Sequence, residues 1–185
     1  MMLSFLLASV SIVDARGATK AGVEIRPSPG KGMGAFTKTK KHLGDVLGWY
    51  DGEVLTEQQR RARIMQIGPL DAHDEEWLES RHRRGVRVSA DYLLGLGDGT
   101  YIDAEDPAES NWCRYINHDS DPNVGLFREK WEDGETYPTF IVLRTCEPGE
   151  ELCFDYGEGF WIDEDAAGEE AHREQGAEHS LYDFQ

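Results

Sequence analysis

The sequence is poor in cysteine. It has only three, Cys113, Cys146 and Cys153, and no two of them form a C-x-x-C pair. An odd, widely spaced set of cysteines can build neither a disulfide framework nor a four-cysteine zinc site within the chain. We therefore expect three buried thiols, which suits a reducing compartment.

Positive charge is also scarce. The chain has 19 Lys and Arg residues against 36 Asp and Glu, a formal net charge of −17. Such a field repels nucleic-acid phosphates, so the composition disfavours sequence-independent nucleic-acid binding and favours a basic partner. Solubility alone is the alternative explanation of the acidic excess. Seven arginines are nevertheless concentrated at positions 60–87, where a solvated helix face is expected.

No stretch is long and apolar enough to span a bilayer, which takes about 20 residues. The apolar segment 1–13 falls short, and it lacks the basic residues that precede the apolar part of a secretory signal. Residues 1–21 are treated as an apolar leader: a signal, an extra strand or helix docked on the domain, or an artefact of the assigned gene start. Residues 162–185 are expected to form an acidic C-terminal tail.

A length of 185 residues, 39% of them apolar, fits one domain with its own core. Alternating residues and turn pairs predict short strands over 22–54. Thr56 and Gln59 predict a capping box at the start of a helix over 58–67. Residues 71–88 are charged and show no clear period. Further elements are expected as strands at 91–96, 101–103, 139–143 and 151–156, and as a short helix at 109–117.

Three segments are unlike ordinary core or turn sequence. Residues 30–34 (GKGMG) have glycines that let a ligand approach the backbone, although a glycine-rich hairpin explains them equally well. Residues 114–123 (RYINHDSDPN) end in a polar cluster that suits a functional loop or a surface turn. Residues 149–157 (GEELCFDYG) predict a strand ending in a tyrosine, whose hydroxyl can face a cleft or lie in the core.

In this order, the three segments resemble the SET domain of protein lysine methyltransferases. The family pattern runs G-x-G, Y-x-G-E, Y-x-I-D-A, R-F-I-N-H-S-C-x-P-N and G-E-E-L-x-F-D-Y-G. Its pieces stand here at residues 32–34, 50–53, 101–104, 114–123 and 149–157. Each piece is weak by itself, whereas the ordered set is specific. The match extends from about residue 23 to 161, roughly three quarters of the chain.

The resemblance implies a mostly β fold with short helices, in which several small β-sheets surround a pseudoknot-like core. The chain from 117 to 123 would be threaded by the segment that ends at Tyr156. The SET domain would occupy residues 22–161 and carry an insert at about 55–90.

The resemblance also implies a methyltransferase that takes S-adenosyl-L-methionine as cofactor and releases S-adenosyl-L-homocysteine. Tyr156 would be catalytic, at the point where the sulfonium methyl group and the lysine amine meet. The lysine channel would be lined by Tyr50, Phe154, Phe160 and Trp161. The residues expected to contact the cofactor are Lys31, Gly32, Met33, Tyr92, Asn117, His118 and Tyr156.

An aromatic channel suits methyl transfer for reasons that do not depend on the family. The lysine amine must be neutral and aligned with the S–CH₃ bond, in a site that excludes water. Aromatic faces attract the incoming ammonium, and desolvation lowers its pKa. Phe154 stands where the family has Phe or Tyr. Because Phe leaves room for a methylated nitrogen, we expect di- or trimethylation.

The chain departs from the family pattern in two places. Asp119 and Ser120 stand where Ser and Cys are usual, and the C-x-C-x-x-x-x-C segment that usually follows F-D-Y-G is missing. In other members these cysteines bind a zinc that closes the channel, so no zinc or other metal site is expected here. Residues 160–165 or a second chain would close the channel instead, which leaves a homodimer open. Asp119 has no assigned role.

Three hypotheses follow for the function. The first is a nuclear or chromosomal histone-tail methyltransferase, whose basic peptide would add as a strand between the Tyr92 strand and residues 56–88. The arginines of the insert either argue against a uniformly basic peptide or would meet nucleosomal DNA, without specific nucleic-acid reading. The second is a catalytically silent SET-like interaction module, which the presence of Tyr156, Asn117 and His118 disfavours. The third is a methyltransferase with a non-histone substrate, secretory or organellar if residues 1–15 are a signal.

Overall fold

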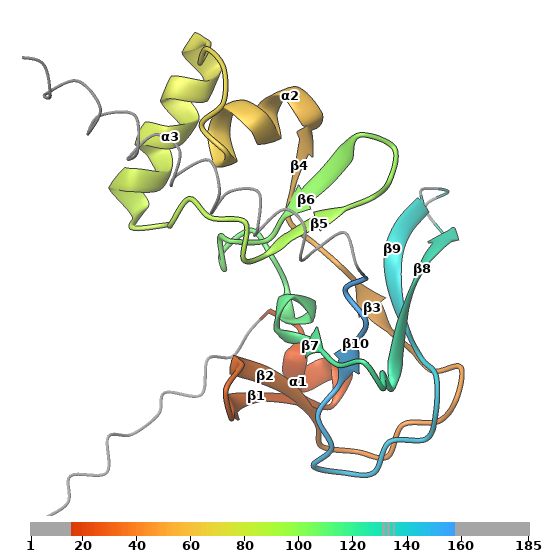
Figure 1. Cartoon of the computed structure of the whole chain (residues 1–185). Coiled ribbons are helices and arrows are strands. Elements are labelled where there is room, and N and C mark those ends of the chain that lie inside the picture. Colours follow the sequence, from red (N-terminus) through yellow and green to blue (C-terminus); the bar gives the residue numbers. More distant parts are fainter. Residues whose placement is uncertain (1–15, 131, 133, 135, 158–185) are drawn as a thin grey trace, which may run out of the picture.

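The structure is a computed structural model that describes residues 16–130, 132, 134 and 136–157 (Figure 1). In this part of the chain, ten short strands form four small sheets, ordered β1–β2, β4–β6–β5, β3–β9–β8 and β7–β10. The strands are β1 (Val23–Ser28), β2 (Gly32–Thr37), β3 (Val46–Trp49), β4 (Glu53–Thr56), β5 (Leu93–Gly95), β6 (Thr100–Asp103), β7 (Asn117–His118), β8 (Val124–Lys130), β9 (Thr136–Val142) and β10 (Cys153–Phe154). The mostly β fold of several small sheets is confirmed.

The helices are short, with one exception. α1 (Ala18–Ala21), α2 (Glu57–Gln59), a π-helical segment (Arg60–Ile64) and a 3₁₀ helix (Trp112–Tyr115) each make about one turn, whereas α3 (Ala72–Arg84) has 13 residues. Figure 1 shows α2 and α3 beside the β4–β6–β5 sheet, at the opposite end of the molecule from the β1–β2 hairpin. Within the described ranges, no helix is long and apolar enough to cross a membrane.

The core forms between the β1–β2 hairpin, the β3–β9–β8 sheet and the 3₁₀ helix. Its least exposed large side chains include Ile25, Ile116, Phe140, Val142 and Leu152. β8 was not expected from the sequence, and it pairs with β9 over seven positions. The three cysteines are free and buried, as predicted.

The short strand β10 is enclosed by the loop that follows β7. On one edge it pairs in parallel with β7, and the amide of Asp119 donates to the carbonyl of Phe154 at 3.1 Å. On the other edge, Cys153 donates to Asn123 Oδ1 at 2.9 Å and accepts from the Asn123 amide at 3.2 Å. Because the same loop bonds both edges of the strand, the last segment threads residues 117–123, as the resemblance implied.

Several elements are shorter than the sequence predicts. The helix expected over 58–67 begins at Glu57 with the predicted capping box and ends its π-helical turn at Ile64. The short helix over 109–117 is reduced to residues 112–115, because Ile116 must turn extended for β7 to pair with β10. The strands expected over 91–96 and 151–156 extend only over 93–95 and 153–154.

Residues 71–88, which showed no period, contain the longest described helix. α3 is well closed at both ends: Asp71 and Asp74 form a capping box, and Gly85 adopts a left-handed φ of 67°. Its only large apolar side chains are Trp77 and Leu78, so no hydrophobic stripe marks it in the sequence.

Three of the seven arginines in this region are buried, so the expectation of a solvated helix face is wrong for them. Arg60, Arg63 and Arg81 have exposed fractions of 8%, 6% and 1%. Their acidic and aromatic partners include residues of other elements, which the local charge pattern could not reveal.

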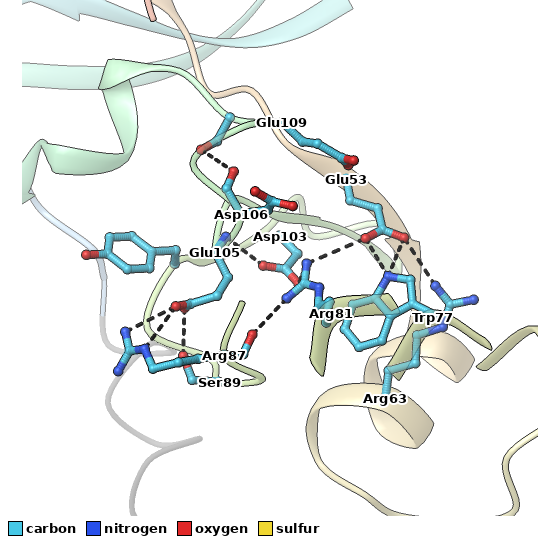
Figure 2. A network of polar contacts seen from close by, with 12 residues as sticks. Glu53, Arg63, Trp77, Arg81, Arg87, Ser89, Asp103, Glu105, Asp106 and Glu109 are labelled. Atoms are coloured by element: carbon cyan, nitrogen blue, oxygen red, sulfur yellow. Dashed lines mark hydrogen bonds and ion pairs between the residues drawn. The ribbon is translucent and has the colours of Figure 1, made fainter. Parts of the chain in front are cut away.

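Figure 2 shows the buried network that docks α3 on the β4–β6–β5 sheet. Arg81 lies 2.7 Å from Asp103, and its guanidinium lies 4.1 Å from the centre of the Trp77 ring. Glu53 accepts hydrogen bonds from Trp77 Nε1 at 2.6 Å and from Arg63 at 3.2 Å. The Arg81–Asp103 contact is an ion pair without hydrogen-bond alignment. Charged and aromatic groups thus hold the insert in place.

Candidate active site

Segments that are distant in the sequence meet around β7. The side-chain amide of Asn117 donates to the Met33 carbonyl at 3.2 Å and to Glu151 Oε1 at 2.8 Å. The Lys31 ammonium donates to the His118 carbonyl at 2.9 Å. The structure therefore brings together four of the residues expected to contact the cofactor.

Two glycines of the hairpin shape this region in different ways. Gly32 has a φ of +79°, and no atom lies within 4 Å of the place where a Cβ would stand. Gly34 is tightly enclosed, because a Cβ there would lie 2.4 Å from Glu151 Oε1. Gly32 leaves the backbone open on one side, and Gly34 lets β2 approach Glu151.

Tyr156 reaches the same region because β7 and β10 are paired. The register His118↔Phe154 places Tyr156 two residues beyond the pair, where its amide donates to His118 Nδ1 at 3.2 Å. Its hydroxyl donates to the Ile116 carbonyl at 3.1 Å. Burial raises the pKa of Tyr156 to about 12, so this hydroxyl keeps its proton at neutral pH.

A row of aromatic rings extends from Tyr156 into the core. The Phe154 ring lies 4.6 Å from the Tyr156 ring and 5.0 Å from the Phe140 ring, measured between centres. Phe140 is 6.2 Å from Tyr50, and burial raises the pKa of Tyr50 well above its usual value. Tyr50 and Phe154, expected in the channel, are thus linked through Phe140, which the sequence did not indicate.

Tyr92 stands immediately before β5 and is tied to the aromatic row. Its carbonyl accepts from the Tyr50 hydroxyl at 2.8 Å and from the Ala104 amide at 3.0 Å. The Arg114 guanidinium covers its ring at 3.7 Å. Both residues line an open pocket of about 450 Å³, whose other walls are residues 84–87 and 105–108.

Sequence reasoning missed three residues of this region: Phe140, Arg114 and Glu151. Arg114 and Glu151 match positions of the family pattern, and this match was the signal that could have identified them. Glu151 accepts from Ser28 Oγ at 2.9 Å as well as from Asn117, so it ties β1 to β7. Phe140 carries no local signal, because its place depends on the pairing of β9 with β3.

Asp119 has a local structural contact. Its carboxylate accepts from the Asp121 amide at 3.0 Å, and this hydrogen bond is the main cause that holds the pKa of Asp119 below its usual value. The carboxylate also lies 3.6 Å from the Lys31 ammonium. Asp119 therefore stabilises the turn after β7 beside the candidate site.

Several expectations fall on residues outside the described part of the chain. These are the channel roles of Phe160 and Trp161, the apolar segment 1–15 and the acidic tail. They stay predictions, as does the absence of zinc. Among the described residues, no group of three or more His, Cys, Asp and Glu side chains is arranged to hold a metal ion.

Comparison with known proteins places this chain in a family. The model of the SET domain matches residues 32–157. The histone-lysine N-methyltransferase ash1 of Drosophila melanogaster is 31% identical over 142 residues, which cover 76% of this chain and 5% of that protein. A human histone-lysine N-methyltransferase, H3 lysine-36 specific, is 30% identical over 135 residues, 72% of this chain and 4% of that protein. The Arabidopsis thaliana histone-lysine N-methyltransferase MEDEA is 30% identical over 138 residues, 75% of this chain and 17% of that protein.

The chain therefore belongs to the SET-domain family. It spans less than a fifth of the length of each of these relatives.

The family implies S-adenosylmethionine-dependent methylation, and the residues present fit this cofactor. Gly32 leaves space at the backbone between Lys31 and Met33, which contact His118 and Asn117. Arg114 Nε is buried and has no hydrogen-bond partner among the described residues, although Arg114 lines the open pocket. A cofactor with a carboxylate, an ammonium and a sulfonium group suits a region that offers carbonyls, a guanidinium and a carboxylate.

Proposed function

We propose that this chain transfers methyl groups from S-adenosylmethionine to the side-chain amine of a lysine in a histone tail, giving di- or trimethyl-lysine. The position of Tyr156 carries the proposal. Its half-buried ring lies beside His118 at one end of an aromatic row, and its hydroxyl donates to the Ile116 carbonyl. The names of the similar proteins, all histone-lysine N-methyltransferases, support the substrate class.

The residues of the site have different roles in the proposed reaction. Bound S-adenosylmethionine supplies the sulfonium methyl group. Lys31, Asn117 and His118 hold the cofactor, while Tyr50 and Phe154 exclude water from the amine. Desolvation lowers the pKa of the substrate lysine from about 10.4, which favours the neutral, nucleophilic form. The Tyr156 hydroxyl orients this amine and stabilises the polarised methyl group, without acting as a strong base.

A basic peptide suits the surface beside Tyr92. β5 is an outer strand of its sheet, so it can accept an extended peptide as an added strand. The net charge of −17 favours basic substrates. Burial of Arg60, Arg63 and Arg81 also removes positive charge from the surface of the insert. A histone substrate would place the protein in the nucleus or on chromosomes.

The direct test offers purified protein and labelled S-adenosylmethionine to core histones, nucleosomes and histone-tail peptides. A peptide centred on lysine 36 of histone H3 is the first choice, because relatives are named for that residue. The matched control replaces the lysine with arginine. Incorporation into no histone substrate, together with no cofactor binding by calorimetry, would favour the silent interaction module. Cofactor binding with methylation of other proteins only would favour a non-histone substrate.

The pH dependence of the reaction should follow the substrate amine. Because the pKa of Tyr156 is about 12, its hydroxyl stays protonated over the working range. We expect kcat/KM to rise roughly tenfold per pH unit between about pH 7 and 9, as the lysine loses its proton. The measurement is a pH–rate profile, with circular dichroism recorded at each pH. If the rate of the folded protein began to decrease with rising pH before about pH 10, Tyr156 would not be protonated as expected.

Phe154→Tyr should change the number of methyl groups transferred. The Phe154 ring lies 4.6 Å from the Tyr156 ring, so a hydroxyl added to it can hold a water or the amine and restrict rotation of the nitrogen. Mass spectrometry should show di- or trimethyl-lysine with the wild type and mainly monomethyl-lysine with the variant. The matched control is Phe127→Tyr, on an exposed ring of β8. A wild type that stops at one methyl group would contradict the prediction.

A further inference from the structure

The segment between α3 and β5 is held by side chains. Residues 86–90 have neither helical nor strand structure, and Tyr92 lies two positions beyond them. The carbonyl of Arg87 accepts from Arg81 at 3.2 Å, which fixes one point of this linker to the buried network. Backbone hydrogen bonds hold the two ends of this linker: the Val86 amide donates to the Arg81 carbonyl at 3.0 Å, and the Ala90 carbonyl accepts from the Leu93 amide at 3.1 Å. The position of residues 87–89 between them depends on side-chain anchors.

Glu105 is the second anchor, and it is buried. Its exposed fraction is 5%, and one carboxylate oxygen accepts from Arg87 Nε at 3.2 Å. The other oxygen accepts from Ser89 Oγ at 2.8 Å, and Ser89 Oγ in turn accepts from the Asp91 amide at 3.3 Å. Figure 2 shows both contacts of the carboxylate. A single buried carboxylate thus reaches the linker at two points, and through Ser89 at a third, one residue before Tyr92.

These contacts lie at the open pocket. Arg87, Glu105, Tyr92 and Arg114 all line it, and the Arg114 guanidinium covers the Tyr92 ring at 3.7 Å. The Glu105 carboxylate therefore holds residues of the linker that form part of the pocket lining. Asp103 and Asp106 flank it in the sequence and bind Arg81 and Arg84, so three neighbouring acids hold the end of the insert.

We infer that Glu105 is a positioning residue for the cofactor site. It fixes residues 87–91 and thereby presents Tyr92 to the cofactor, an inference that rests on the function proposed above. Pre-organised side chains bind more tightly because they lose less freedom on binding. Without this anchor, the linker must be ordered at the moment of binding, so cofactor affinity falls while the transfer step, carried by Tyr156, continues.

The test compares the wild type with Glu105→Gln, which keeps the size of the side chain and removes the charge. S-adenosylhomocysteine should bind about tenfold more weakly to the variant by calorimetry. The KM for S-adenosylmethionine should rise by a similar factor, with kcat at saturation within about twofold. Amide hydrogen exchange of residues 86–92 should be about tenfold faster in the cofactor-free variant. Ser89→Ala, a milder change, should act in the same direction.

The matched control is Glu147→Gln, which removes an acid from the exposed pair with Lys40 and should leave all these values unchanged. Faster exchange with unchanged affinity would overturn the positioning role, and so would a loss confined to kcat. A wild type that binds no S-adenosylhomocysteine would overturn the proposed function as well. The exchange measurement needs no cofactor, so it separates this outcome from a failure of the anchor itself.

Discussion

Replacing Tyr156 with Phe is expected to lower kcat by about 100- to 1,000-fold, the usual effect of losing one donor at a reacting centre. The substitution removes a single oxygen from a half-buried side chain, so packing against Phe154 and His118 is kept. S-adenosylhomocysteine should still bind within about threefold of the wild type, because the loss falls on the transfer step. Single-turnover methylation of a histone peptide measures the first value, and calorimetry the second.

Tyr101→Phe is the matched control for this experiment. It also removes one phenolic oxygen, but from a ring of β6 that lies 4.7 Å beneath Arg60, in the insert. Its methylation rate should stay near that of the wild type. If Tyr156→Phe retained the wild-type rate, the hydroxyl would have no part in the reaction. The aromatic row alone would then have to orient the amine.

Replacing Arg81 with Met should cost about 3–5 kcal/mol of the free energy of unfolding, because it leaves a buried acid without its cation. Arg81 is 1% exposed, and the side chain of its partner Asp103 is fully buried. This is a large part of the stability of a single domain, which is about 5–15 kcal/mol. Chemical denaturation followed by tryptophan fluorescence measures the effect.

Arg83→Met provides the control on the same helix. Arg83 is exposed and lies 3.6 Å from Glu79, so its removal should cost less than about 1 kcal/mol. Adding Asp103→Asn to Arg81→Met should recover part of the lost stability, because the buried charge disappears. Equal stability of the Arg81 and Arg83 variants would show that the network does not hold α3.

The loss of stability caused by Arg81→Met should also depend on pH. Burial raises the pKa of Asp103 in the folded protein, and Arg81 partly offsets that rise. An acid whose pKa is raised in the folded state stabilises folding when it is protonated, and this contribution is fully present below the unfolded-state pKa of about 3.9. The contribution is lost as the pH rises through the folded-state pKa. Without Arg81 the rise is larger. The gap to the wild type should therefore narrow as the pH falls toward about 4.

Local chemistry made part of the fold predictable. Thr56 and Gln59 form the expected capping box, and the alternating residues of β1 form a strand. α3 was missed because it has no apolar stripe; ion pairs of Arg81 with β4 and β6 dock it instead. β8 was missed because its residues gain their strand structure from β9.

Some residues of the candidate site could likewise be predicted from the sequence, and others could not. Asn117, His118 and Tyr156 could be found because their neighbours in the sequence form a specific ordered pattern. Phe140 and Glu105 could not, because each acts through contacts with segments that lie far away or carry no pattern. Lys31 and Met33 were expected from the hairpin, but their contacts with β7 depend on the threaded core.

The enclosure of β10 has a consequence for folding kinetics. Asn117 and Cys153 pair although 36 positions separate them (153 − 117), and β8 and β9 lie between them in the chain. Closing such a long loop loses chain entropy before the new contacts can compensate for it, so the step is slow. This pairing is therefore expected late in folding. Tyr156 then joins Asn117 and His118 only when the remaining sheets exist. Catalytic competence would appear with the last step of folding, and partly folded chains would be inactive.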